Sequence, residues 1–445
     1  MNSSSSIRAD VAGLRIYRGH KVLAALFFGS FMVFGGGLYS FVLFVPPLTQ
    51  EFHWSRAATS GLVTAFWLSA PMILLGGLAI KRAGTVRLQV AGILIEALCL
   101  GLLPMVNSFG EMYLLRAAMG FGKVMFIVTL PYAISFWYSR RYSLGLSIAW
   151  TGLHVGGVVL APFTGLIIAH YGWRSACFAI AAGLLTVGLI PILITQGFRR
   201  PDEHPLKLDG GALRAGSSEA DGQGHESVAA GEEAASGSIG HLLRSPMFWT
   251  IALVTLSFYG AYGGLLTQAA AVAEGAGFSP RLASLGLGAT AGFAAVGGLA
   301  FGWLLDRYSI RAAGIAIHLL LVAGAVSLLI VDRAHSATAL VFYTISFGCA
   351  IGASDLYFVA ILRRCFPNVS IAYSYSVWYF CEILSLLIAG PAAGRLFDLT
   401  GNYEATLALL AGSAAFALLL SIVVWRRPGL EGLRVLILSP ATESA

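Results

Sequence analysis

Long apolar stretches recur along almost the whole chain, and no other feature restricts its fold so strongly. Only 11% of the residues are charged, whereas soluble proteins carry about 25%. Each helical crossing of a bilayer takes roughly 20 apolar residues. Because lipid cannot satisfy backbone amides, and because the runs are too long for barrel strands, we expect helices. We predict twelve spans, at residues 22–45, 57–80, 88–106, 111–135, 143–169, 174–197, 247–272, 281–304, 312–331, 337–361, 371–396 and 404–425.

The apolar segments repeat at half the chain length. A proline and two glycines in residues 162–172 recur with the same spacing in residues 391–401, 229 positions later. A basic turn with glycine at 77–84 has a counterpart at 302–311, with an offset of 225. Such repetition is typical of membrane proteins built from two symmetry-related halves. The fold class that we predict is an all-α membrane protein with twelve transmembrane helices in two pseudo-symmetric six-helix halves.

Basic residues are distributed unevenly between the two ends of the spans. If the N-terminus lies inside, the tails and inner loops hold 21 of the 28 lysines and arginines, and the outer loops hold five. This asymmetry follows the positive-inside rule and places both termini in the cytoplasm. The net charge of +7 is therefore explained by topology, and nucleic acid is not an expected partner. We expect a multi-pass protein of the cell membrane, either inner or plasma, embedded in the lipid bilayer.

Composition divides the chain into five parts. Residues 1–21 form a polar, basic cytoplasmic tail, and residues 22–197 hold the first six spans. Residues 198–245 are rich in Gly, Ala, Ser and Glu, which predicts a flexible cytoplasmic linker. The second six-helix bundle occupies residues 246–426, and residues 427–445 form a short cytoplasmic tail.

No pattern in the sequence indicates a metal site, a cofactor or a catalytic centre. Five cysteines lie in or beside the spans without a CxxC pair, and the histidines of the linker match no metal-site spacing. A nucleophile elbow and a phosphate-binding loop are also missing. We therefore predict that the protein is not an enzyme and uses no cofactor.

Two basic residues, Arg116 and Lys123, lie inside the fourth span. A charge at membrane depth is costly and survives mainly where it is paired or lines an aqueous cavity. Their spacing places both on one helix face, roughly 10 Å apart, and Gly120 between them would leave that face open. We predict that both bind an anionic substrate. The alternative for Arg116 is that it fixes helix 4 to a neighbouring helix through backbone carbonyls.

Two acidic residues lie inside later spans, Asp355 in the tenth and Glu382 in the eleventh. Intramembrane carboxyl groups often serve as proton carriers, so we predict proton coupling at either residue. The alternative is a static pair with a cation across the cavity, such as Lys123. His154 lies 228 residues before Glu382, so pseudo-symmetry makes the two near-equivalents. We place His154 in the substrate site, as a relay or as a neutral packing residue.

Three tyrosines complete the predicted substrate site. Tyr39 follows three glycines in helix 1, and Tyr262 precedes two glycines in helix 7. Glycines at mid-membrane suit a helix that flexes or approaches a ligand, and they equally suit close helix packing. Tyr379 shares the helix face of Glu382. We expect these tyrosines to contact the substrate.

Charged residues at the cytoplasmic ends of two spans are predicted to form gates. Asp306, Arg307 and Arg311 follow the eighth span, where they can form a cluster that closes this end and breaks as the halves rock. Arg140 and Arg141 stand at the foot of the fifth span. The alternative is that these loops merely obey the positive-inside rule.

Several of these motifs resemble those of a known family, the major facilitator superfamily. The turn at residues 302–311 (GWLLDRYSIR) resembles its signature between helices 8 and 9, and residues 116–122 (RAAMGFG) resemble its helix 4 motif. The copy after helix 2 departs from the signature, because Lys81 stands where an aspartate is usual. The resemblance covers nearly the whole chain and implies the twelve-helix fold of that superfamily.

Within the superfamily, the chain most resembles the monocarboxylate transporter and oxalate:formate antiporter group. Three stretches carry this resemblance, at residues 39–56, 136–152 and 394–403. It implies proton-linked movement of small organic anions. The group often places an arginine in helix 8 where this chain has Gly298, so the charge partners of an anion would have to come from elsewhere.

Together these observations predict a secondary active transporter that works by alternating access. We expect it to move a small organic anion, a monocarboxylate in the first instance, together with a proton. One alternative is a proton-driven exporter of apolar or cationic compounds, which aromatic residues and buried acids would also suit. A second alternative is a receptor on the same fold that binds its ligand without moving it.

Overall fold

The structure is a computed structural model, and it describes residues 18–54, 62, 65–138, 141–196 and 239–425. Within this part of the chain the regular elements are helices. Those of the first half are α2 (Arg18–Phe34), η2 (Gly35–Tyr39), η3 (Ser40–Phe44), α3 (Val45–Phe52), η4 (Ala70–Leu75), α5 (Gly76–Ala83), α6 (Thr85–Leu102), η5 (Leu103–Met105), α7 (Phe109–Ile127), α8 (Leu130–Ser135), α9 (Tyr142–Gly183), η6 (Leu184–Leu189) and α10 (Ile190–Thr195).

The second half consists of longer, less interrupted helices. They are α12 (Ile239–Arg244), α13 (Pro246–Gly275), α14 (Pro280–Arg307), α15 (Ile310–Ala334), α16 (Ala337–Cys365), α17 (Ile371–Thr400) and α18 (Tyr403–Trp425). Short α12 lies within the stretch that we expected to be a flexible linker; the remainder of that stretch up to residue 238 lies outside the described residues.

The predicted all-α membrane fold is confirmed. Ten helical segments of the described chain are long and apolar enough to cross a membrane. One of them runs for 54 residues, from Tyr142 to Thr195, and it combines the two spans predicted at 143–169 and 174–197. The predicted span at 57–80 is described only in part, as η4 and α5. With these two adjustments the elements agree with the twelve-helix architecture.

The double-length segment turns back at Gly172. This glycine has φ of +80°, a left-handed conformation that residues with a Cβ rarely adopt. No neighbouring atom lies within 4 Å of the position that a Cβ would take there. The glycine is therefore needed for the backbone turn and not for close packing.

Serine and glycine residues set the ends of helices in the second half. The side chains of Ser279 and Ser336 accept hydrogen bonds from the backbone N–H groups of Leu282 and Ala339, at the starts of α14 and α16. Gly401, with φ of +69°, ends α17. These local signals define connections of only a few residues between long helices.

The glycine triplet of helix 1 allows this helix to pack closely against its neighbours. Residues 35–39 form a π-helical turn between α2 and η3. A Cβ on Gly35 would lie 2.6 Å from the backbone of Gly156 in α9, and a Cβ on Gly36 would meet Ile180. The structure thus places helix 1 backbone directly against α9, which favours the packing interpretation of these glycines.

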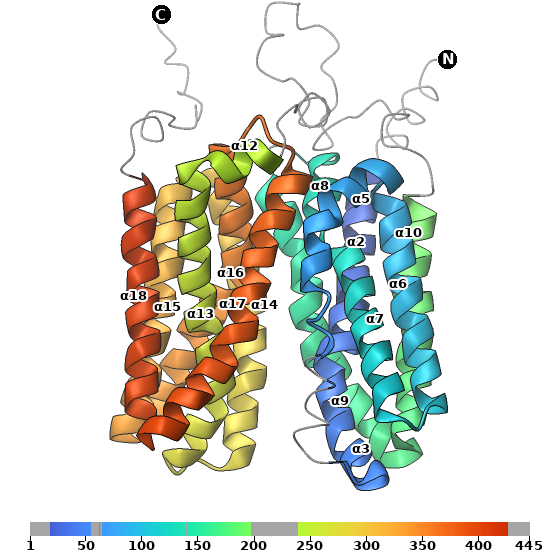
Figure 1. Ribbon diagram of the computed structural model, residues 1–445, viewed down its shortest axis with the longest axis horizontal. Helices are drawn as coiled ribbons and strands as arrows, with labels where there is room; N and C mark the ends of the chain where they lie inside the picture. The colour runs from blue at the N-terminus through green and yellow to red at the C-terminus, as the bar shows by residue number, and fades with distance from the viewer. Residues whose placement is uncertain (1–17, 55–61, 63–64, 139–140, 197–238, 426–445) are drawn as a thin grey trace, which may run out of the picture.

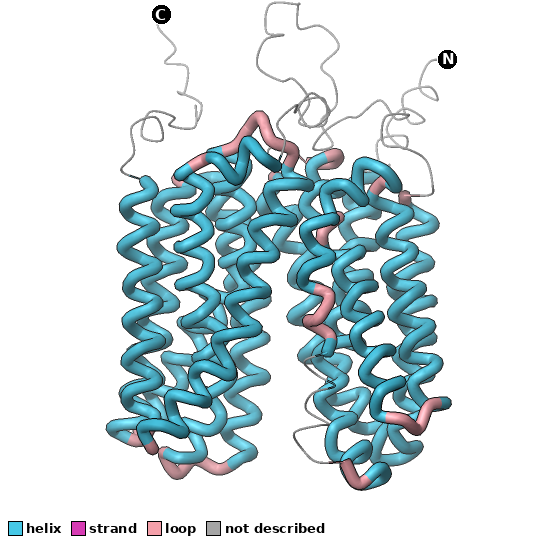
Figure 2. Tube along the Cα trace, viewed as in Figure 1, coloured by secondary structure: helices cyan, strands magenta, loops and turns pink. Residues whose placement is uncertain are grey.

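The two halves form bundles that stand side by side (Figure 1). At the end where α5, α8 and α12 lie, α17 contacts η4, α5 and α8, and α14 packs along α9. At the opposite end, near α3, Figure 1 shows the ribbons of the bundles drawn apart. Figure 2 shows loop segments inside the first bundle, whereas the second is helical along its length.

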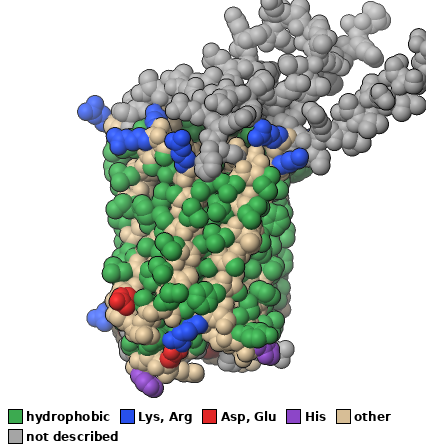
Figure 3. Space-filling view, turned by 90° about the vertical axis from the view of Figure 1, so that its right-hand side faces the viewer, with side chains coloured by type: hydrophobic (Ala, Val, Ile, Leu, Met, Phe, Trp, Pro, Cys, Tyr) green, Lys and Arg blue, Asp and Glu red, His purple; other side chains and the backbone are tan. Residues whose placement is uncertain are grey.

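The outer surface carries a broad apolar belt, as expected for contact with lipid. Figure 3 shows hydrophobic side chains over the middle of the first bundle and a row of Lys and Arg at the end nearest the termini. Within the described chain, Leu114 is 70% exposed and Ile194 is 76% exposed. In water such exposure would be costly, but in a bilayer it costs nothing.

Candidate functional site

A cavity of about 620 Å³ lies between the halves. Helix 1, the interrupted second span, the end of α7 and α9 line it from the first half, and α13, α16 and α17 line it from the second. Its size is that of a small-molecule site. The ionisable groups among the lining residues are Tyr39, His154, Tyr262, Asp355, Tyr379 and Glu382.

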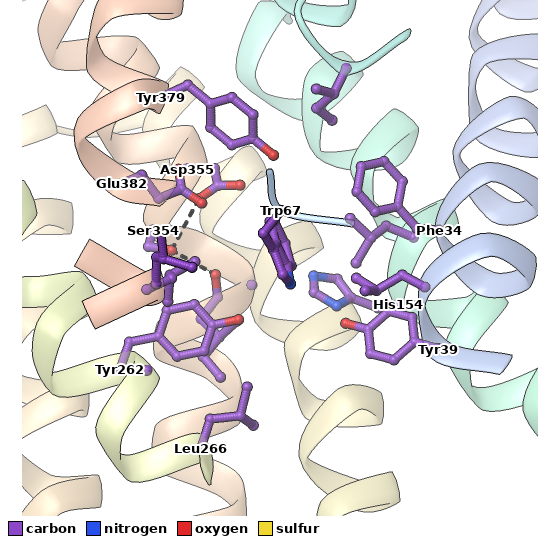
Figure 4. A pocket seen from close by; sticks show the side chains of 18 of the residues that line it. Phe34, Tyr39, Trp67, His154, Tyr262, Leu266, Ser354, Asp355, Tyr379 and Glu382 are labelled. Atoms are coloured by element: carbon purple, nitrogen blue, oxygen red, sulfur yellow. Dashed lines mark hydrogen bonds between the residues drawn. The ribbon is translucent and has the colours of Figure 1, made fainter. Parts of the chain in front are cut away.

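Two carboxyl groups face this cavity from the second half. Asp355 in α16 accepts a hydrogen bond from the hydroxyl of Tyr259. Glu382 in α17 is 6% exposed, and its Oε2 has no hydrogen-bond partner within the described part of the chain. Figure 4 shows both carboxyls beside the ring of Tyr379, directed toward the opening between the halves. The acids predicted from the sequence therefore meet at one wall.

The opposite wall is formed by His154, Tyr39 and Trp67 (Figure 4). Tyr39 ends the π-helical turn of helix 1, and its ring lies against Gly157 of α9, where a Cβ would come within 2.9 Å of it. His154 is one turn before that glycine. Close packing of helix 1 on α9 thus brings the histidine and the tyrosine together.

The cavity lining includes all the tyrosines and the histidine that the sequence indicated. The ring of Tyr262 from α13 lies tilted against that of Tyr259, at 5.7 Å between ring centroids, and it also contacts Phe347. Tyr375 stacks on Tyr379 at 5.4 Å. Aromatic packing therefore fixes the orientation of this wall. The roles of these residues in binding remain predictions.

Arg116 does not line the cavity. Its guanidinium donates hydrogen bonds to the carbonyls of Gly37, at 2.8 Å, and Leu62, at 3.1 Å. It also lies 3.5 Å from the ring centroid of Phe41. These contacts join helix 4 to the first two spans, as in the structural alternative that the sequence left open.

Lys123 is also enclosed, with a side chain only 1% exposed. Its Nζ lies 3.8 Å from the ring centroid of Trp67 and 4.9 Å from that of Phe66. Within the described residues this ammonium has no hydrogen-bonding partner. The expected open face beside Gly120 is closed, because the backbone of Phe66 packs directly on that glycine. Lys123 still interacts electrostatically with Glu382 across the halves.

The helix 8 position at which the resembling group often has arginine is filled by packing. A Cβ on Gly298 would lie 2.9 Å from the carbonyl oxygen of Gly352 in α16. Helices α14 and α16 are therefore too close here to hold a long side chain without moving. The glycine at this position is thus accompanied by a tight helix contact.

Asp306 lies at the contact between the halves. Its two carboxylate oxygens accept hydrogen bonds from the backbone N–H groups of Ser143 and Leu144, both at 2.9 Å. These groups belong to the first turn of α9, where a negative charge is favourable. One turn earlier in α14, Gly302 packs against Ser147. This arrangement joins the end of α14 to the start of α9.

The other predicted gate residues are placed differently. Arg307 lies over the ring of Trp303 at 4.5 Å, within its own helix. Arg311 and Arg141 are exposed, and Arg140 lies outside the described residues. The gating roles of these residues remain predictions.

The same end is closed on the other side by a contact of different chemistry. Lys81 lies 4.6 Å from the ring centroid of Tyr373 at the start of α17. Gly76 packs against Ser376 of the same helix. Where the second half offers the carboxylate of Asp306, the first half thus offers a cation–π contact.

Trp67, which lines the cavity, and Tyr259, which is buried behind it, were not singled out from the sequence. Trp67 lies in a turn within the second span, and single-sequence periodicity gave no reason to choose it. Tyr259 lies one turn before Tyr262 on α13, so the helical spacing of the two tyrosines is a signal that could have identified it. Its hydrogen bond to Asp355 depends on the packing of α13 on α16.

Comparisons with known proteins agree with this architecture. Residues 26–362 match the family model described as Major Facilitator Superfamily. Monocarboxylate transporter 13 of Bos taurus is 26% identical over 409 residues, which cover 89% of this chain and 88% of that protein. Monocarboxylate transporter 12 of Homo sapiens is 24% identical over 293 residues, 63% of this chain and 56% of that protein.

Solved structures give the same fold. The E. coli fucose:proton symporter FucP has a TM-score of 0.62 at 15% identity, with 91% of this chain and 97% of that one covered. The proton:xylose symporter XylE has a TM-score of 0.69 at 14% identity, with coverage of 91% and 94%. The match of the family model, which extends over more than half of the chain, shows that this protein belongs to the Major Facilitator Superfamily.

Proposed function

We propose that this protein is a proton-coupled secondary transporter of small monocarboxylates that works by alternating access. The observation that carries the proposal is the pair Asp355 and Glu382 on one wall of an inter-half cavity, with the buried cation Lys123 near the other. The similarity to proteins named monocarboxylate transporters supports the choice of substrate class.

Coupling follows from the charges at this cavity. Two ionised carboxylates would repel an entering anion, each by about 2 kcal/mol at roughly 7 Å in an effective dielectric of about 20. A proton on either carboxyl reduces that repulsion, so that the attraction of Lys123 for the anion outweighs what remains. Protons and substrate therefore bind more strongly together than separately. This is the thermodynamic requirement for symport.

Alternating access needs two ends that open in turn. In this conformation the halves touch through Asp306 and α9, and through α5 and α17. We infer that these contacts break when the other end closes, and that the units that rock are residues 22–197 and 246–426. By the positive-inside rule, the closed end with its row of basic residues (Figure 3) would face the cytoplasm of a cell membrane.

The test is uptake by purified protein in liposomes. Radiolabelled benzoate is the probe, because it presents a carboxylate on an aromatic body that fits the lining. We expect an inward proton gradient to drive benzoate accumulation faster than in protein-free liposomes, and a protonophore to abolish the accumulation. Accumulation that ignores the pH gradient would contradict proton coupling, and the absence of benzoate binding and flux would contradict the substrate class.

A second candidate is a proton-driven exporter of cationic or apolar compounds. The observation in its favour is that the acids lie exposed to the cavity among aromatic rings, whereas Lys123 does not line it. Benzylamine and benzamide are the matched cationic and neutral probes. Proton-dependent efflux of benzylamine without benzoate flux would favour the exporter, and binding without any flux would indicate a receptor.

A further inference from the structure

Trp67 contacts the cavity and the buried ammonium at once. Its side chain lines the cavity between His154 and the acidic wall (Figure 4). The centroid of its ring lies 3.8 Å from Nζ of Lys123. Lys123 itself is 1% exposed and is not part of the lining. The indole is therefore the contact between this cation and the space where a substrate would lie.

The direct contacts of this ammonium are cation–π contacts with Trp67 and Phe66, and the carboxyl groups of Glu382 and Glu96 add longer-range attraction. Burying a charge without hydrogen bonds is costly, and aromatic faces recover part of the loss. A carboxylate would recover more, because charge-assisted hydrogen bonds are among the strongest polar contacts in proteins. A carboxylate that could reach Lys123 would thus outcompete the indole.

The backbone beneath Trp67 is not a continuous α-helix. Residues 66–69 form a turn followed by the 3-10 helix η4. The N–H groups of Leu68 and Met72 bond three residues back, at 3.1 and 2.9 Å. Interrupted helices in transporters typically line the substrate cavity. The phenylalanine next to Trp67, in contrast, is held against Gly120 of helix 4.

We propose that Trp67 is an exchangeable cover for Lys123: its indole lies over the ammonium when the site is empty, and a carboxylate substrate displaces it. The inference rests on the proposed function and adds a determinant of specificity. When the indole moves, an anion can form an ion pair with Lys123, whereas a neutral or cationic compound obtains no such interaction. Selectivity for anions is thereby possible in a cavity whose exposed ionised groups are acids.

The first test asks whether the indole covers the lysine, without any substrate. Purified protein is treated with acetic anhydride, and acetylation of each lysine is followed by mass spectrometry, with exposed Lys21 as internal reference. We expect Trp67→Leu to accelerate acetylation of Lys123 at least about tenfold, and Trp67→Phe to leave it near the wild-type rate. Trp150→Leu is the matched control, since Trp150 lines the same cavity but packs on Tyr375.

The second test measures binding of benzoate and benzylamine by calorimetry at fixed pH. We expect Trp67→Leu to tighten benzoate binding roughly tenfold and to leave benzylamine unchanged. In a Lys123→Gln background the same substitution should have no effect on benzoate, because the cation is gone. Trp67→Met replaces Trp67→Leu if the latter is not monodisperse.

The outcomes separate this inference from the proposed function. Equal acetylation of Lys123 in Trp67→Leu and Trp150→Leu would overturn the cover. So would a Trp67→Leu effect on benzoate that persists without Lys123. If acetylation rises as expected but no variant binds benzoate, the cover stands as a structural feature and the proposed anion transport is refuted.

Discussion

At the scale of single residues, the two acids of the cavity lie in unequal surroundings. Asp355 accepts a hydrogen bond from the hydroxyl of Tyr259, whereas Oε2 of Glu382 has no hydrogen-bond partner in the described chain. A hydrogen bond donated to a carboxylate favours its ionised form. A buried carboxyl that lacks such a bond is more stable when it is protonated and neutral. Glu382 is therefore the better candidate for the proton that moves.

This difference leads to a prediction about pH dependence. Benzoate uptake by the wild type should rise as the outer pH falls, because protonation removes the repulsion at the cavity wall. We expect Glu382→Gln, which mimics the protonated form, to flatten this dependence, and Asp355→Asn to reduce it less. Initial rates across a pH series in liposomes provide the measurement. A Glu382→Gln profile with the wild-type slope would refute the assignment.

A second prediction concerns a clamp at the end opposite the termini. Glu51 forms an ion pair with Arg174 at 2.7 Å and accepts a hydrogen bond from Nε1 of Trp173. The Arg174 guanidinium, with help from Trp173, lowers the pKa of Glu51 below its ordinary value of 4.5. A lowered pKa means that the stabilisation is complete above the ordinary value and is lost as the pH falls through the folded-state value.

We therefore expect Glu51→Gln to lower the thermal unfolding temperature at neutral pH by a small amount, of the order of one degree, since both side chains are partly exposed. The difference from the wild type should vanish in acid. Melting curves in detergent at several pH values provide the measurement, and a difference that grows in acid would contradict the clamp.

At the scale of elements, helix 1 and α9 approach each other through glycine. A Cβ on Gly156 would lie 3.0 Å from Cα of Gly35. We expect Gly156→Ala to destabilise the protein by about 1–3 kcal/mol, the usual cost of overpacking. Gly412→Ala in α18 is the control, because no atom lies within 4 Å of its Cβ position and alanine favours a helix. Chemical denaturation should separate the two variants, and equal stability would contradict the packing role.

Element identity was predictable from the sequence, and side-chain direction was less so. The apolar runs gave the spans, because lipid allows few alternatives to helices. The seven-residue spacing of Arg116 and Lys123 did place both on one helix face, but periodicity cannot say what packs on that face. Leu62, Phe66 and Trp67 of the second span fill it. Pro71, four residues after Trp67, is a sequence signal for the irregular turn at 66–69 that the sequence analysis did not use, so Trp67 was missed.

At the scale of the whole molecule, the two halves use different chemistry to close the same end. The second half presents Asp306 to the N-terminus of α9, and the first half presents Lys81 to Tyr373. Half-length repetition predicted the two bundles but not this asymmetry, which follows from one aspartate being replaced by lysine. The two contacts should therefore respond differently to substitution, because only the carboxylate pairs with backbone amides.

The last prediction concerns the balance between the two open states. Asp306 is bonded to two backbone amides at a helix start, a contact worth about 1 kcal/mol or more. Asp306→Ala should shift the population toward the state open at the end near the termini, about fivefold for 1 kcal/mol. Distances between spin labels on the two halves at that end would report the shift, with Asp398→Ala, an exposed acid of α17, as control. An unchanged distance distribution would show that the packing of α14 on α9 closes this end without the carboxylate.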